Sequence, residues 1–222
     1  TANLVGAAAG HWYGIEFDEY DQGSMITGVD ILYAGRGTSA VDIDRSAPTL
    51  DDVYVGYSAS HGIRVYGVSS APTITNSTIH QSTSHGLYFE VSSGLAAGTG
   101  RGLTGNTFTM NGGAGIALYA DLVSEIDDDN VFSSNGPDIE IVGNGEVTES
   151  ATWLALSVPY TVNTTIDVMG ALNPVLTIKD GAVLEFEPGK KIEVGRGSVG
   201  SGTLRVEGDV VGLYDWDSDG FG

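Results

Sequence analysis

The stretch Gly62-Ile63-Arg64-Val65 contains the pattern that decides the fold of this chain: a small residue, an aliphatic residue, a variable residue and an apolar residue. The other copies are Gly14-Ile15-Glu16-Phe17, Ala40-Val41-Asp42-Ile43, Gly86-Leu87-Tyr88-Phe89, Gly115-Ile116-Ala117-Leu118 and Asp138-Ile139-Glu140-Ile141. The aliphatic residue therefore recurs at a nearly regular interval along the chain. A β-strand places alternate side chains on opposite faces. Each copy predicts a short strand whose two apolar residues enter a core.

The same pattern predicts which side chains face the core. The expected inward residues are Ile15, Phe17, Val41, Ile43, Ile63, Val65, Leu87, Phe89, Ile116, Leu118, Ile139 and Ile141. The expected outward residues are Glu16, Asp42, Arg64 and Tyr88. A repeat of this length that is built from strands is typical of a solenoid. We predict an all-β, right-handed parallel β-helix, or β-solenoid, with about 22–30 residues per coil in the first half.

Turn-forming residues recur between these copies. Asp52, Asn76, Asn106 and Asn130 follow one another at intervals that match the interval of the strand pattern. Asparagine tolerates left-handed backbone and bonds to nearby backbone groups, so it suits a turn. We predict that these four residues form a ladder of stacked turns whose side chains bond from coil to coil.

The pattern of apolar residues changes after Trp153. Short alternating segments, mostly separated by Gly or Pro-Gly, place Leu176, Leu184, Ile192 and Leu204 at much shorter steps than those of the first half. Two or three such short faces would close one coil. The expected organisation is β-helix coils over 1–141, a junction over 142–152, a second β-solenoid module over 153–211 and an acidic tail over 212–222.

Two runs of the sequence carry a resemblance to a known family. Residues 153–208, which include LTIKDGAVLEFEPG and GTLRVEG, resemble the module with which bacterial secreted right-handed β-helix proteins of the pectin-lyase-like superfamily begin. Their partner run is similar to HWYGIEF at 11–17 and ILYAG at 31–35. The resemblance implies the fold and a secreted or cell-surface, bacterial-type location. It implies little about activity.

The order of the two runs is shifted in this chain. GTLRVEG commonly precedes the HWYGIEF run, so the module reads as circularly shifted. Two interpretations follow: one period of a longer tandem array, or open coil ends that stack head-to-tail into a homopolymer. The first ten residues lack the basic segment of a signal peptide. We expect that segment to be removed or to lie upstream in a longer chain.

Charge excludes several partners. Nine Lys and Arg face 29 Asp and Glu, which gives a formal net charge of −20. Nucleic acids and anionic membrane surfaces repel such a chain. No apolar run reaches the roughly 18 residues of a membrane span. The acidic excess suits solubility or divalent cations.

A candidate calcium site lies in the acidic tail. Asp215, Asp217 and Asp219 alternate along the chain and are followed by Gly220. Calcium-binding loops offer oxygen ligands in this way, so calcium is the expected cofactor there, with a solvated acidic tail as the alternative. The run at 127–129 (DDD) is more typical of a solvated loop.

A carbohydrate site is the main alternative to a structural role. Asp42, Asp44 and Arg64 are predicted to approach one another on neighbouring coils, and His61 and His85 to lie one coil apart. A polysaccharide lyase needs clustered carboxylates and a base, and a hydrolase needs paired carboxylates. However, the NTD and RIK runs of polygalacturonases are absent and basic residues are scarce. Ordinary surface residues are the favoured interpretation.

These observations favour a non-catalytic extracellular structural or surface protein that assembles head-to-tail or forms part of a tandem array. Polysaccharide is a further candidate partner. The alternative is a carbohydrate-active or carbohydrate-binding β-helix, similar to polysaccharide lyases or hydrolases. No catalytic residue is assigned.

Overall fold

The computed structural model describes residues 6–21, 23–67, 70–90, 102–195 and 200–208. In these ranges the regular secondary structure is β-strand, apart from one 3-10 helix, η1 (Ala120–Glu125). Parallel strands follow one another around successive coils, so the predicted right-handed parallel β-solenoid is confirmed. None of the described helical segments is long and apolar enough to cross a membrane.

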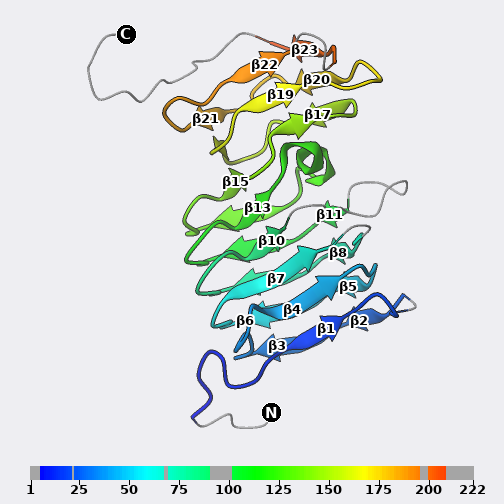
Figure 1. The fold of residues 1–222 in the computed structure, drawn as a ribbon. Helices are drawn as coiled ribbons and strands as arrows, with labels where there is room; N and C mark the ends of the chain where they lie inside the picture. Colours follow the sequence, from blue (N-terminus) through cyan, green and yellow to red (C-terminus); the bar gives the residue numbers. More distant parts are fainter. Residues whose placement is uncertain (1–5, 22, 68–69, 91–101, 196–199, 209–222) are drawn as a thin grey trace. The chain divides into compact units, whose positions relative to one another are not determined.

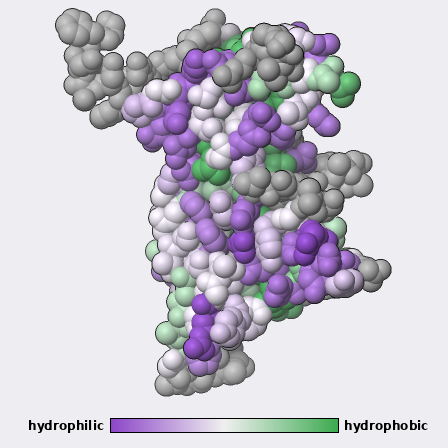
Figure 2. Space-filling model, viewed as in Figure 1, coloured by the Kyte–Doolittle hydropathy of each residue, from purple (hydrophilic) through white to green (hydrophobic). Residues whose placement is uncertain are grey.

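The chain forms two compact units. The first contains Thr1–Ala117 and Glu125–Asp138, and the second contains Leu118–Ser124 and Ile139–Gly222. Described residues on the face seen in Figure 2 are mostly hydrophilic or neutral in hydropathy, and apolar residues appear in small separate areas.

The first unit contains three parallel sheets (Figure 1). One sheet contains β1 (Ile15–Phe17), β4 (Ser39–Asp44), β7 (His61–Tyr66), β10 (Leu87–Phe89) and β13 (Ile116–Leu118), which reaches the boundary of the unit. Another contains β2 (Met25–Thr27), β5 (Thr49–Asp51), β8 (Thr73–Thr75) and β11 (Leu103–Thr104). The third contains β3 (Asp30–Leu32), β6 (Tyr54–Gly56), β9 (Thr78–His80), β12 (Thr107–Thr109) and β14 (Val131–Ser133).

The register of the first sheet follows the sequence repeat. Ile15 pairs with Val41, Val41 with Ile63, Ile63 with Leu87, and Leu87 with Ile116. Every predicted core residue is buried except Ile15, which is half-buried. Burying one such side chain stabilises the fold by about 1.5–3 kcal/mol. Packing of this inward column is therefore a principal source of stability in the unit.

The second unit repeats the three-strand coil. Its sheets contain β15 (Ile139–Ile141), β18 (Tyr160–Val162) and β21 (Leu184–Phe186); β16 (Glu146–Val147), β19 (Ile166–Val168) and β22 (Ile192–Val194); and β17 (Ala151–Trp153), β20 (Val175–Ile178) and β23 (Thr203–Val206). Leu184, Ile192 and Leu204 lie on the three faces of one coil. Leu176 belongs to the preceding coil and pairs with Leu204.

The four residues predicted to form one ladder lie in two adjacent columns. Asp52 stacks next to Asn76, and both have left-handed backbone, with φ of 55° and 50°, and exposed side chains. In the next coil this position is held by Gly105, with φ of 66°. Asn106 and Asn130 lie one residue further along, and their side chains are buried.

Asn106 and Asn130 join successive coils. The backbone N–H of Ser77 donates to Oδ1 of Asn106 at 3.0 Å, and the N–H of Asn106 donates to Oδ1 of Asn130 at 3.0 Å. Nδ2 of Asn106 donates to the carbonyl of Ile74 at 2.8 Å. Each amide thus satisfies backbone groups at a buried corner, where the strand hydrogen bonds are interrupted.

A second ladder, absent from the sequence-based prediction, occupies another corner. The N–H of Ser82 donates to Oδ1 of Asn111 at 3.0 Å, and the N–H of Asn111 donates to Oδ1 of Asn135 at 3.1 Å. Nδ2 of Asn111 donates to the carbonyl of Ile79 at 3.2 Å. Asparagine side chains therefore link successive coils through backbone hydrogen bonds at both corners.

We predict that Asn106→Ala destabilises the protein by about 2–4 kcal/mol, because it removes the acceptor of the buried Ser77 N–H and the side-chain donor to the Ile74 carbonyl. Urea unfolding monitored by circular dichroism measures the change. Asn163→Ala is the control, since Asn163 is exposed and donates to Glu140; its expected effect is within about 0.5 kcal/mol. Equal losses in both variants would contradict a special role for the ladder.

Candidate functional site

Polar side chains stack in columns on the outer face of the first sheet. Glu16 on β1 pairs in register with Asp42 on β4, Asp42 with Arg64 on β7, and Arg64 with Tyr88 on β10. In the next outward column, Asp44 pairs with Tyr66. Neighbouring strands lie about 4.8 Å apart. The register therefore brings side chains that are distant in sequence within reach of one another.

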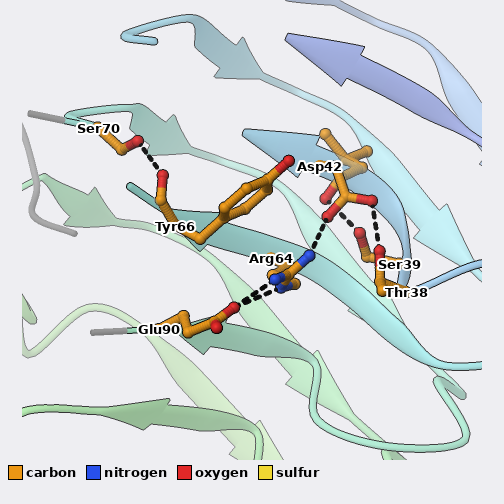
Figure 3. Close-up of polar contacts among 8 residues, drawn as sticks. Thr38, Ser39, Asp42, Arg64, Tyr66, Ser70 and Glu90 are labelled. Atoms are coloured by element: carbon orange, nitrogen blue, oxygen red, sulfur yellow. Dashed lines mark hydrogen bonds and ion pairs between the residues drawn. The ribbon is translucent and has the colours of Figure 1, made fainter. Parts of the chain in front are cut away.

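Arg64 is held between two carboxylates (Figure 3). Its Nε donates to Oε2 of Glu90 at 2.8 Å, its Nη2 bonds to the same oxygen, and its Nη1 lies 3.4 Å from Oδ1 of Asp42. The guanidinium also lies 4.0 Å from the centre of the Tyr66 ring. On the far side of Asp42, Oγ1 of Thr38 donates to Oδ2 at 2.7 Å.

These contacts stabilise the positively charged form of Arg64. Burial by itself would lower the pKa of Arg64, but the hydrogen bond and charge of Glu90, with the charge of Asp42, raise it overall. The cation is matched by carboxylates on both sides and is only 19% exposed. It therefore contributes little free positive charge to the surface.

A partly open cavity of about 250 Å³, which we call the outer groove, lies beside this network. Its lining residues are Tyr13, Gly14, Ile15, Glu16, Gly37, Thr38, Ser39, Asp42 and Tyr66. Gly14 has φ of 129°, and an added Cβ would overlap the carbonyl oxygen of Ala40. Glycine at this position therefore allows the close approach of the coils under the groove.

The groove combines aromatic and acidic groups. Tyr13 is 71% exposed, and the guanidinium of Arg36 lies 5.5 Å from its ring centre. The pKa of Tyr66 is raised by burial first, and then by the negative charges of Asp44, Asp42 and Glu16. The hydroxyl of Tyr66 thus stays neutral and can donate or accept a hydrogen bond.

An aromatic stack borders the network on the same sheet. The rings of His61 and His85 are 5.3 Å apart and nearly parallel, and each stacks on Tyr88, at 4.8 and 5.4 Å. Nδ1 of His85 accepts the N–H of Ala114 at 2.8 Å. Nδ1 of His61 is buried and has no hydrogen-bond partner among the described residues. Burial first, then His85 and Arg64, lower the pKa of His61 to about 4.

The structure brings together some of the predicted site residues. Asp42 and Arg64 are in contact, and His61 and His85 stack one coil apart. Asp44 instead pairs with Arg45 at 2.7 Å. Glu90 was not predicted. The strand register could have placed it, because Phe89 pairs with Val65, and Glu90 and Tyr66 each lie one position further along.

The calcium prediction falls outside the described residues. Asp215, Asp217 and Asp219 lie in 209–222, which the structure does not describe. Within the part of the chain that it does describe, no group of three or more His, Asp or Glu residues is arranged to hold a metal ion.

The fold and the groove define a parallel β-helix protein with a polar, aromatic site on the outer face of one sheet. A family model described as a right-handed β-helix region matches residues 13–150, more than half of the chain. The chain belongs to this family. Neither a search of curated proteins nor a search of solved structures found a match.

His61 predicts a pH dependence of stability. Because its folded pKa of about 4 lies below the ordinary value of 6.5, the unfolded chain takes up a proton first as the pH falls, and stability declines between pH 6.5 and about 4. We expect a loss on the order of 1–2 kcal/mol between pH 7 and pH 5. Urea unfolding at both pH values measures it. His61→Gln should remove this part of the slope, and an unchanged slope would refute the assignment.

Proposed function

We propose that this protein is a saccharide-binding β-helix and that the outer groove holds one sugar residue of a longer chain. The observation that supports it is the pairing of Tyr13 and Tyr66 with the carboxylates of Glu16 and Asp42 around one cavity. Aromatic rings offer an apolar face to a sugar ring, and carboxylates accept hydrogen bonds from its hydroxyl groups. The volume is slightly below that of sites for drug-sized ligands, roughly 300–1,000 Å³, and suits a single sugar ring.

The geometry favours binding over hydrolysis. Both oxygens of Asp42 are engaged, one by Arg64 and the other by Thr38. Such contacts hold the carboxylate in place as an acceptor. They also occupy the positions from which it would activate water or protonate a leaving group.

Tyr13→Ala should weaken the binding of oligosaccharides about fivefold, because stacking on an aromatic ring contributes roughly 0.5–1.5 kcal/mol. Isothermal titration calorimetry against a panel of neutral, amino and uronic oligosaccharides provides the measurement. Tyr20→Ala is the matched control, since Tyr20 is 78% exposed and does not line the groove. An absence of binding to the whole panel, or equal weakening by the two variants, would overturn the proposal. Release of reducing ends during incubation would point to hydrolysis instead.

A second candidate function is end-to-end association with a second copy of the chain. In the coil formed by β21, β22 and β23, Val194 is 41% exposed and Val206 is 49% exposed. Their partners one coil earlier, Val168 and Ile178, are 0% and 7% exposed. Among the described residues, no further strand pairs with β22 or β23, and exposed apolar side chains at such an edge favour pairing with another chain. This supports the proposal of head-to-tail assembly.

The double substitution Val194→Lys with Val206→Lys should abolish such assembly, because lysine at a strand edge opposes pairing. Sedimentation velocity over a range of concentrations, with electron microscopy, would detect the change. Leu172→Lys, at a position 81% exposed outside the strands, is the control. A wild-type chain that stays monomeric at high concentration would exclude assembly.

Two further parts of the proposal rest on sequence alone. The resemblance to secreted bacterial β-helix proteins supports a location outside the cell or on its surface. The alternating carboxylates of Asp215, Asp217 and Asp219 support calcium binding in that segment.

A further inference from the structure

The charge around the outer groove indicates which class of saccharide it would bind. This inference rests on the proposed saccharide-binding function. Glu16 lines the groove and is exposed, and its side chain makes no hydrogen bond or ion pair with any described residue. Its register neighbour Asp42 also lines the groove. Both carboxylates therefore face the volume that a ligand would fill.

Two of the nearby arginines, Arg64 and Arg45, do not balance this charge. Arg64 lies between Asp42 and Glu90, and Arg45 pairs with Asp44 at 2.7 Å and Glu19 at 3.5 Å. Each of these guanidinium groups serves two carboxylates. The groove is thus left negative, in a chain whose formal net charge is already −20.

The position of Arg36 indicates where the groove attracts a cation. Its guanidinium lies over the ring of Tyr13, 5.5 Å from the centre, and it forms no ion pair with a carboxylate among the described residues. A cation over a tyrosine face is attracted by the negative face of the ring. Because Arg36 is itself exposed, a ligand's ammonium group can compete with it for this position.

We infer that the outer groove selects amino saccharides, sugars with a protonated amine, over neutral and uronic ones. The ammonium group would lie near Glu16 and the ring of Tyr13, where opposite charge and the aromatic face both attract it. A uronic sugar brings a carboxylate to the same place and is repelled. A neutral sugar keeps the stacking and the hydrogen bonds but gains nothing from the charge.

The test compares a glucosamine tetramer with the N-acetylglucosamine tetramer, which has the same backbone without the charge. Calorimetric titration at about pH 6 favours the protonated form of the sugar amine. The wild type should bind the glucosamine tetramer at least about fivefold more tightly, and added salt should reduce this preference by screening. Glu16→Gln should remove most of the preference. Arg36→Gln should strengthen binding of the glucosamine tetramer alone.

Controls separate this inference from the function on which it rests. Glu187→Gln, an exposed carboxylate in the second unit, should leave both affinities unchanged. Equal binding of the two tetramers, with sensitivity to Tyr13→Ala retained, would overturn the amino-saccharide preference and leave saccharide binding intact. Preference for a galacturonate oligomer would also overturn it. Binding of none of the three would overturn both proposals.

Discussion

The parallel hydrogen-bond register between successive coils is the constraint on which the rest of this structure depends. It places each residue directly beside its counterpart one coil away, so that a pattern along the sequence becomes a column in space. The step from Ile15 to Val41 is longer than the step from Val41 to Ile63, yet both pairs stay in register. Differences in coil length are therefore taken up outside the paired strands.

The sequence was sufficient to predict the columns within strands but not those at the corners. The inward residues could be assigned because apolar residues at alternate positions of a strand all lie on the same face. At a corner, asparagine and glycine can both adopt left-handed backbone, and so Asn76 is followed by Gly105 rather than by Asn106. Pairing of Leu103 with Ile74 in the adjoining strands decides this one-residue difference. The second ladder was open to prediction, since Asn111 and Asn135 follow Asn106 and Asn130 at the same short spacing.

The candidate site, too, could be predicted only where its residues lie on paired strands. The contact between Asp42 and Arg64 follows from strand register, and extending that register by one residue would have found Glu90. The outer groove could not be predicted in this way, because Tyr13, Gly37 and Thr38 lie outside the strands. Their positions depend on the path of loops, for which no simple period in the sequence exists.

Stacked charge explains why the groove is negative at this end of the outward column. Like charges directly opposite each other on neighbouring strands are destabilising, and Glu16 and Asp42 form such a pair. Arg64 compensates Asp42 from the next strand, and Glu90 completes that arrangement. No described side chain does the same for Glu16. The charge of Glu16 thus adds to the negative charge of the cavity beside Tyr13. A bound cation at that point would relieve the repulsion between Glu16 and Asp42, so ligand binding and stability of the first coil should be linked.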